Sequence, residues 1–178
     1  MRSEMPEYSM VQMSTQPGTG ERVLDGGMVG TVSIDVDNRD GSPILTLWFV
    51  NPMLQPVEFT LPPLHAGRLL ATMGKGEELA KWESFKPTGD RDPVVDYRRT
   101  GVPTAEFGPM ADMKTFLELS TGNMRFAVKF PIFTGKPPLG FTLDPALCLT
   151  LLMSLYKLYE MYDWDGHNAA KGVGKTVN

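Results

Sequence analysis

The chain has 178 residues, a net charge of −4 and 42 % hydrophobic residues, a composition typical of one globular domain rather than of a disordered chain. The negative balance excludes a protein that coats nucleic acid through bulk positive charge, because phosphate neutralisation supplies most sequence-independent affinity. No apolar run is long enough to span a bilayer, and the N-terminal residues resemble neither a signal peptide nor a transit peptide. We therefore expect a cytoplasmic protein without membrane contact.

The first part of the chain predicts an arm followed by strands. Residues 1–24 are rich in Met, Ser, Gln, Pro and Gly without any hydrophobic period, so we expect a flexible arm outside the core. Residues 27–36 and 43–50 have strand-like patterns on either side of a turn-rich cluster at 37–42, which predicts a hairpin. A further strand is predicted at 57–61.

The middle of the chain predicts a short helix and then more strands. Proline in the first turn and apolar residues at helical spacing indicate a helix over 62–73, and further helical turns are predicted within 76–85. The segments 94–99, 113–119 and 124–133 read as strands, the last two of which are joined by a turn.

The clearest predicted element is a helix from Asp144 to about Trp164, with Asp144 as its N-cap and Pro145 at the first helical position. Its polar residues form one narrow stripe, and an apolar arc this wide favours burial from two sides, by the sheet and by a neighbouring subunit. The alternative is a central helix that its own chain surrounds. The predicted oligomer interface consists of Leu151, Leu152, Leu155, Leu158, Tyr159 and Tyr162.

One internal repeat indicates how these elements are organised. The segment 59–63 followed by Leu69 and Leu70 matches the segment 141–145 followed by Leu151 and Leu152 at a constant offset. A chance match between two short apolar segments is the alternative to a duplication. The prediction is an α+β domain over residues 25–165, made of two antiparallel β-sheet units that are each followed by a helix, with a flexible tail over 166–178.

Signals for catalysis and for metal binding are weak. The chain has two histidines, His65 and His167, without a second ligand at metal-binding spacing, and it has no cysteine pair. Cys148 lies in the apolar helix, where a buried structural thiol is favoured over a nucleophile. We therefore expect no catalytic residue, no metal and no cofactor, and we do not expect an enzyme.

The predicted middle strands carry the mixture of rings and cations that binds single-stranded nucleic acid. In 124–130, Phe126 and Val128 share one face while Arg125 and Lys129 share the other. One face of the sheet is therefore expected to be core and the other cationic. The alternative is ordinary solvated strand charges above core aromatics. The candidate nucleic-acid-binding residues are Trp48, Lys86, Arg91, Tyr97, Arg98, Arg99, Lys114, Phe116, Arg125 and Lys129.

The order strands, helix, strands and long helix, entered through Phe141-Thr142-Leu143-Asp144-Pro145, resembles the Whirly family of single-stranded DNA-binding transcription proteins. Kinetoplast RNA-binding proteins and positive-cofactor-four coactivators are related to that family. The resemblance implies two sheet-plus-helix halves in each protomer, a tetramer held together by the long helices, and bases lying across the sheets. The family's lysine-containing motif is absent from 30–34, so the candidate residues above rest on side-chain chemistry alone.

The short chain is similar to a phage-encoded member of that group, such as the single-stranded DNA-binding factors of podoviruses. The resemblance implies a homo-oligomeric protein that supports phage transcription, by loading RNA polymerase, or replication. Its expected partners are single-stranded DNA, further copies of itself as a tetramer or larger assembly, and a phage RNA polymerase. The alternatives are RNA binding on the same sheets and a structural self-assembling protein that binds no nucleic acid.

Overall fold

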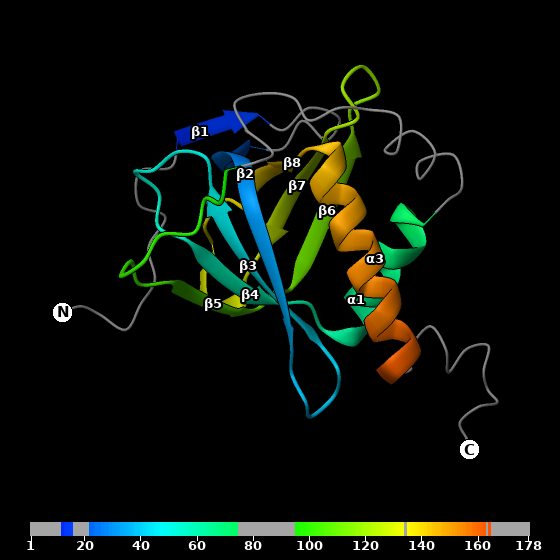
Figure 1. Ribbon diagram of the computed structural model, residues 1–178. Helices are drawn as coiled ribbons and strands as arrows, with labels where there is room; N and C mark the ends of the chain where they lie inside the picture. Colours follow the sequence, from blue (N-terminus) through cyan, green and yellow to red (C-terminus); the bar gives the residue numbers. More distant parts are fainter. Residues whose placement is uncertain (1–11, 16–21, 75–94, 134, 163, 165–178) are drawn as a thin grey trace.

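The computed structural model describes residues 12–15, 22–74, 95–133, 135–162 and 164. Within these residues an eight-stranded sheet curls around a core, and two helices lie side by side at one side of it (Figure 1). The α+β class predicted from the sequence is confirmed. The elements are β1 (Gln12–Thr15), β2 (Arg22–Val36), β3 (Pro43–Phe49), β4 (Val57–Thr60), α1 (Pro63–Met73), β5 (Ala105–Pro109), β6 (Asp112–Leu117), β7 (Met124–Lys129), η1 (Pro131–Phe133), β8 (Leu139–Leu143) and α3 (Pro145–Tyr162).

The strand order is β5-β4-β3-β2-β8-β7-β6, and β1 pairs with the start of β2. The long strand β2 belongs to both halves of the sheet, because residues 24–28 pair with β8 whereas residues 29–36 pair with β3. At the opposite edges, the N–H groups of Met110 and Ala111 bond to carbonyls at the ends of β4 and β7. Met110 and Ala111 connect β5 directly to β6, so the two edge strands of the curled sheet are consecutive in the chain.

This topology corrects part of the sequence prediction. We expected two antiparallel units, but the pairs β2–β8 and β4–β5 are parallel, and both halves share β2. Parallel neighbours need a crossover connection, and the chain between β4 and β5 contains α1. Alternation of side chains identifies a strand but does not specify the direction of the strand beside it.

The two strand-to-helix junctions of the internal repeat are both present, since β4 leads into α1 and β8 leads into α3. Phe59 and Phe141, which occupy equivalent positions in the repeat, contact each other with ring centroids 6.3 Å apart. Phe141 also stacks on Phe126 at 4.9 Å, and Phe59 meets Phe130 edge to face at 5.4 Å. These rings join the two halves of the sheet in one hydrophobic core.

Helix α3 begins where the sequence predicts, because Oδ1 of Asp144 accepts the N–H of Leu147 at 3.0 Å and caps the first turn. Its inner face is covered by its own chain: Leu151, Leu152 and Leu155 are 1 %, 1 % and 0 % exposed. These three leucines cannot also meet a second copy, which corrects that part of the predicted interface. Half-buried against the same core are Leu158, Tyr159 and Tyr162.

The end of α3 is attached to the β2–β3 hairpin. Trp164 is 2 % exposed and donates its Nε1–H to the carbonyl oxygen of Gly41 at 2.8 Å. Gly41 has a φ of +78°, and a Cβ there would lie 2.3 Å from Cγ of Tyr162. Only glycine fits this position without strain, so the hairpin turn and the helix end are built against each other.

Two predictions near the N-terminus and in the middle of the chain are wrong. The predicted arm over 1–24 contains β1 and the start of β2, and Val23 is fully buried. Residues 95–99 form no strand; the strand of this region is β5, which its Gly108 and Pro109 made hard to recognise.

Other predicted elements are shortened or fall outside the description. The strand predicted over 124–133 ends at Lys129, because Pro131 has no N–H for a ladder and begins η1 instead. The helix predicted within 76–85 and the tail over 166–178 lie outside the described residues. Within the described ranges, no helix combines the length and the apolar character that crossing a membrane requires.

Replacing Trp164 with Phe tests how α3 is attached. The substitution keeps most of the apolar volume but leaves the Gly41 carbonyl without its donor, so we expect the free energy of unfolding to fall by about 1–3 kcal/mol. Urea titration followed by circular dichroism measures the loss. Trp48→Phe on the outer surface of β3 is the matched control and should change stability less; equal losses would contradict the role given to the Trp164 hydrogen bond.

Candidate nucleic-acid interface

The outer surface of β6 and β7 brings four of the predicted residues together. The alternation predicted for β7 is confirmed in part: Phe126 and Val128 are 1 % and 0 % exposed while Arg125 and Lys129 lie on the other side, but Ala127 between them is only 3 % exposed. In the β6–β7 pairing, Phe116 lies opposite Arg125 and Lys114 lies opposite Ala127. We call this surface the cationic face, and it consists of Lys114, Phe116, Arg125 and Lys129 together with Asp112, which lies opposite Lys129.

Arg125 occupies the end of the cationic face next to the β6–β7 turn. Its Nη2 lies 3.6 Å from Oε2 of Glu118, whose other carboxylate oxygen accepts a hydrogen bond from the Thr121 hydroxyl at 2.7 Å. Its Nε is buried without a hydrogen-bond acceptor among the described residues. Because the ion pair is long and the Glu118 carboxylate is shared with Thr121, Glu118 offsets only part of the Arg125 charge.

A second group of predicted residues lies elsewhere, on the outer surface of β2 and β3. Trp48 is opposite Thr31 in the β2–β3 pairing, and the N–H of Tyr97 donates to the Thr31 hydroxyl at 3.1 Å. The Tyr97 ring lies so close to Gly30 that a Cβ there would be 2.3 Å from it. Arg99 Nη2 donates to the Phe49 carbonyl at 3.1 Å, so segment 95–99 is held on the sheet.

Arg98 contributes little positive charge to that surface. Its Nη2 lies 2.6 Å from Oδ2 of Asp96, and both side chains are more than half exposed. Hydrogen bonds from Arg98 lower the pKa of Asp96 to about 2, so the carboxylate is ionised at neutral pH. The pair is therefore locally neutral, and Arg98 is a weak candidate for a phosphate contact.

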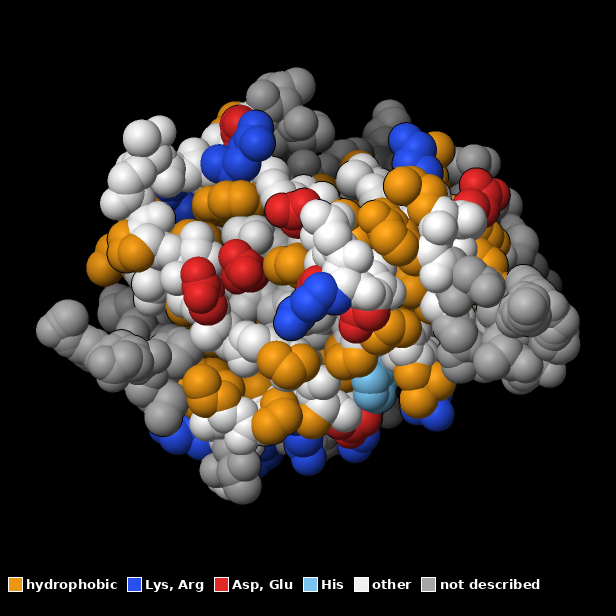
Figure 2. Space-filling view, turned by 90° about the horizontal axis from the view of Figure 1, so that it is seen from below, with side chains coloured by type: hydrophobic (Ala, Val, Ile, Leu, Met, Phe, Trp, Pro, Cys, Tyr) orange, Lys and Arg blue, Asp and Glu red, His pale blue; other side chains and the backbone are white. Residues whose placement is uncertain are grey.

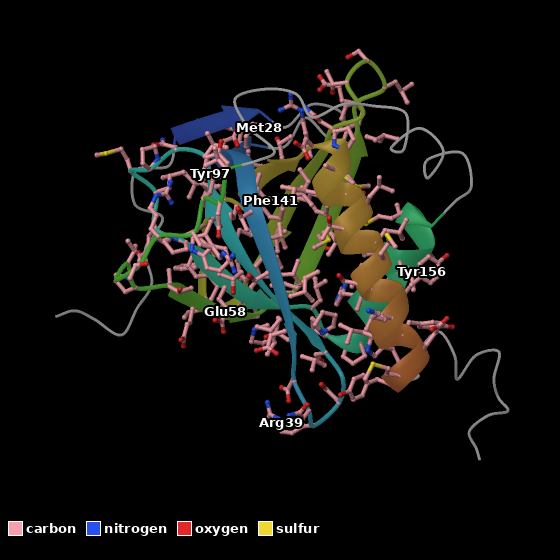
Figure 3. All side chains as sticks on the ribbon, viewed as in Figure 1. Met28, Arg39, Glu58, Tyr97, Phe141 and Tyr156 are labelled. Carbon is pink, nitrogen blue, oxygen red and sulfur yellow. The ribbon has the colours of Figure 1, made fainter. Side chains whose placement is uncertain are left out.

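Three carboxylates share the outer surface of the β2–β5 half, which we call the acidic face: Asp35, Glu58 and Glu106. Glu58 lies opposite Glu106 in the β4–β5 pairing. Burial raises the pKa of Glu58, and the neighbouring charges of Glu106 and Asp35 raise it further. In Figure 3, Glu58 and Tyr97 lie on the same side of the curled sheet, away from α3. A phosphate chain is repelled here.

The sheet surface is thus divided by charge. Figure 2 shows several Lys and Arg side chains along the lower rim, and hydrophobic and acidic side chains with a few further basic ones on the face turned toward the viewer. The predicted Lys86 and Arg91 lie outside the described residues. Sequence reasoning missed the acidic face, although alternation in β4 already placed Glu58 opposite to the buried Val57 and Phe59.

The described part of the chain was searched for side-chain clusters suited to metal binding and for a reactive thiol. No cluster of three or more His, Cys, Asp or Glu side chains suited to a metal ion is found among its residues. The Cys148 thiol is fully buried, and burial raises its pKa far above the usual range, so it is protonated at neutral pH. This agrees with the structural role predicted for that thiol.

Comparison with protein-family models, with curated proteins and with solved structures found no match.

Replacing Glu58 with Gln tests the repulsion on the acidic face. The raised pKa means that the folded state disfavours ionised Glu58, so this destabilisation is absent well below pH 4.5 and grows as pH rises through the raised pKa. We expect the variant to be more stable at pH 7 by up to about 1 kcal/mol, as for cross-strand like charges, with no gain at acidic pH. Thermal unfolding across pH measures this, and a pH-independent difference would contradict it.

Proposed function

We propose that the protein binds single-stranded DNA on its cationic face. The observation that carries this proposal is the partly buried ring of Phe116, which lies on the outside of the sheet with Arg125 opposite and Lys114 on the same strand face. Single strands are bound by aromatic side chains that stack on bases and by cations that contact phosphates. A duplex hides its base faces, so this arrangement favours an unpaired strand.

The division of charge supports a single binding surface. With a net charge of −4 and an acidic face on the other half of the sheet, the protein attracts phosphate locally. Contacts from Lys114, Arg125 and Lys129 give a slope of about −2 when the logarithm of the binding constant is plotted against the logarithm of salt concentration. We assign a smaller share of the binding free energy to the other described candidates, which are Trp48, Tyr97, Arg98 and Arg99.

We further propose the biological setting that the resemblance implies, a Whirly-like protein that exposes or protects an unpaired strand in phage transcription or replication. The element order of strands, α1, strands and α3 supports it. RNA is the rival ligand on the same surface. Competition between matched DNA and RNA oligonucleotides separates the two, because RNA differs by its 2′-hydroxyl.

Two substitutions on the cationic face test the proposal. We expect Lys114→Ala to weaken binding of an unpaired oligonucleotide and to reduce the steepness of its salt dependence by about 0.7. We expect Phe116→Leu, which keeps an apolar side chain but removes the aromatic face, to cost about 1–3 kcal/mol of binding free energy. Fluorescence anisotropy measures both.

Arg98→Ala is the control, since it removes one cation from a locally neutral pair. If Lys114→Ala and Phe116→Leu both bind as the wild-type chain does, the assignment to the cationic face is wrong. If the wild-type chain binds no oligonucleotide at any salt concentration, the structural, self-assembling alternative replaces the proposal.

Self-association remains part of the proposal, on the outer side of α3. The exposed apolar side chains of that helix are Met153, Tyr156 and Met161, at 68 %, 44 % and 66 %. We expect Met153→Lys with Met161→Lys to sediment as a smaller species than the wild-type chain while keeping its circular dichroism spectrum. Sedimentation identical to that of the wild type contradicts an interface here.

A further inference from the structure

A hollow of about 430 Å³ lies where β7 leaves the sheet and the chain turns toward β8. Phe130 and Phe133, which are 3 % and 7 % exposed, line it from the core side. Pro131 and Pro137 add apolar walls. The remaining lining includes two lysines, Lys129 and Lys136, and no carboxylate among the described residues.

The hollow is formed by the fold itself. The N–H of Phe133 donates to the Phe130 carbonyl at 3.0 Å, and the N–H of Lys136 donates to the Phe133 carbonyl at 2.9 Å, so successive turns shape its wall. The Phe133 ring also packs edge to face on Phe107, with centroids 4.8 Å apart.

The chemistry of the lining selects the class of ligand. The ammonium groups of Lys129 and Lys136 favour an anion over a metal cation, although Asp112 opposite Lys129 offsets part of that charge, while the rings and prolines favour a flat, apolar group. A volume of about 430 Å³ is within the usual range for small-molecule sites. A nucleotide combines a flat base with an anionic phosphate, and it satisfies both requirements at once.

Lys129 belongs both to this hollow and to the cationic face. Along β7, Arg125 and Lys129 lie on the same side of the strand about 13 Å apart, so a strand that crosses Phe116 and passes Lys114 arrives at the hollow. We propose that the hollow is a subsite for one nucleotide at the end of the bound strand, with its base against Phe133 and the prolines and its phosphate at Lys129 and Lys136. This inference rests on the proposed function.

Asp112 offers a way to raise the affinity. It lies directly opposite Lys129 in the β6–β7 pairing, so its carboxylate weakens the positive potential at the mouth of the hollow. Replacing it with Asn removes one negative charge with little change of shape. If the hollow binds a nucleotide, the Asp112→Asn variant should bind it more tightly than the wild-type chain does. If the hollow has a purely structural role, the substitution should not raise the affinity.

The test uses the full chain, a short oligothymidylate with a 5′-phosphate, and thymidine 5′-monophosphate. We expect Lys136→Ala to lose about fivefold in affinity for the oligonucleotide, the effect of one phosphate contact. Lys157→Ala, at an exposed lysine on α3, is the matched control. It should change the affinity less than twofold, because salt screens a charge that is remote from the binding site. Equal effects of the two variants overturn the subsite.

The mononucleotide separates this inference from the proposed function. We expect thymidine 5′-monophosphate to shift the backbone amide resonances of Phe133 and Lys136 in the wild-type chain and in Lys114→Ala, but not in Lys136→Ala. If the oligonucleotide binds and these resonances do not move, the subsite is wrong and the cationic face stands. If these resonances move but no oligonucleotide binds, the proposed function fails and the hollow is a separate nucleotide site.

Discussion

The rings of Phe59 and Phe141 meet where the two halves of the sheet face each other, and the remaining architecture depends on that contact. Each ring belongs to a strand that leads directly into a helix. When the two rings pack, β4 and β8 are brought across the core from one another, and α1 and α3 follow them to the same side. The sheet then has to curl, and β2 has to serve both halves.

Curling gives the sheet an inner surface that is fully occupied and an outer surface that is open only in part, since Ala127 and Thr142 on that side are 3 % and 6 % exposed. The inner surface takes the aromatic and aliphatic side chains of both halves together with the inner face of α3. The outer surface collects the side chains that alternate with them, and these differ between the two halves. Around Arg125 and Lys114 the outer surface is basic, while around Glu58 it is acidic.

This division explains how a chain of net negative charge can present a local site for an anionic polymer. Under the proposed function, contacts with phosphate would lie on the β6–β7 half, and the carboxylates of the β2–β5 half would keep a bound strand there. The hollow beside η1 lies at the end of this path, where β7 leaves the sheet at Lys129. The same feature that ends the strand, a proline without an N–H, also supplies one wall of the hollow.

Local chemistry in the sequence was enough to predict several parts of this protein. The Asp144 cap with Pro145 placed the start of α3, and the alternation around Phe126 placed Arg125 on an outward surface. Both features depend only on residues within a few positions along the chain, so the sequence alone predicts them. The equivalence of Phe59 and Phe141 was also visible as a repeat, although their contact was not.

Only the tertiary structure decided which distant segments meet. The wide apolar arc of α3 indicated burial on more than one side, but whether Leu151 faces a second copy or the chain's own core depends on the position of α1 and the sheet. Likewise, the repulsion between Glu58 and Glu106 arises from a parallel pairing that no local pattern specifies. Arg98 was a candidate binding residue in the sequence, and the structure shows that it pairs with Asp96, two residues earlier. Periodicity determines which way a side chain points relative to its own element, whereas packing determines what it meets there.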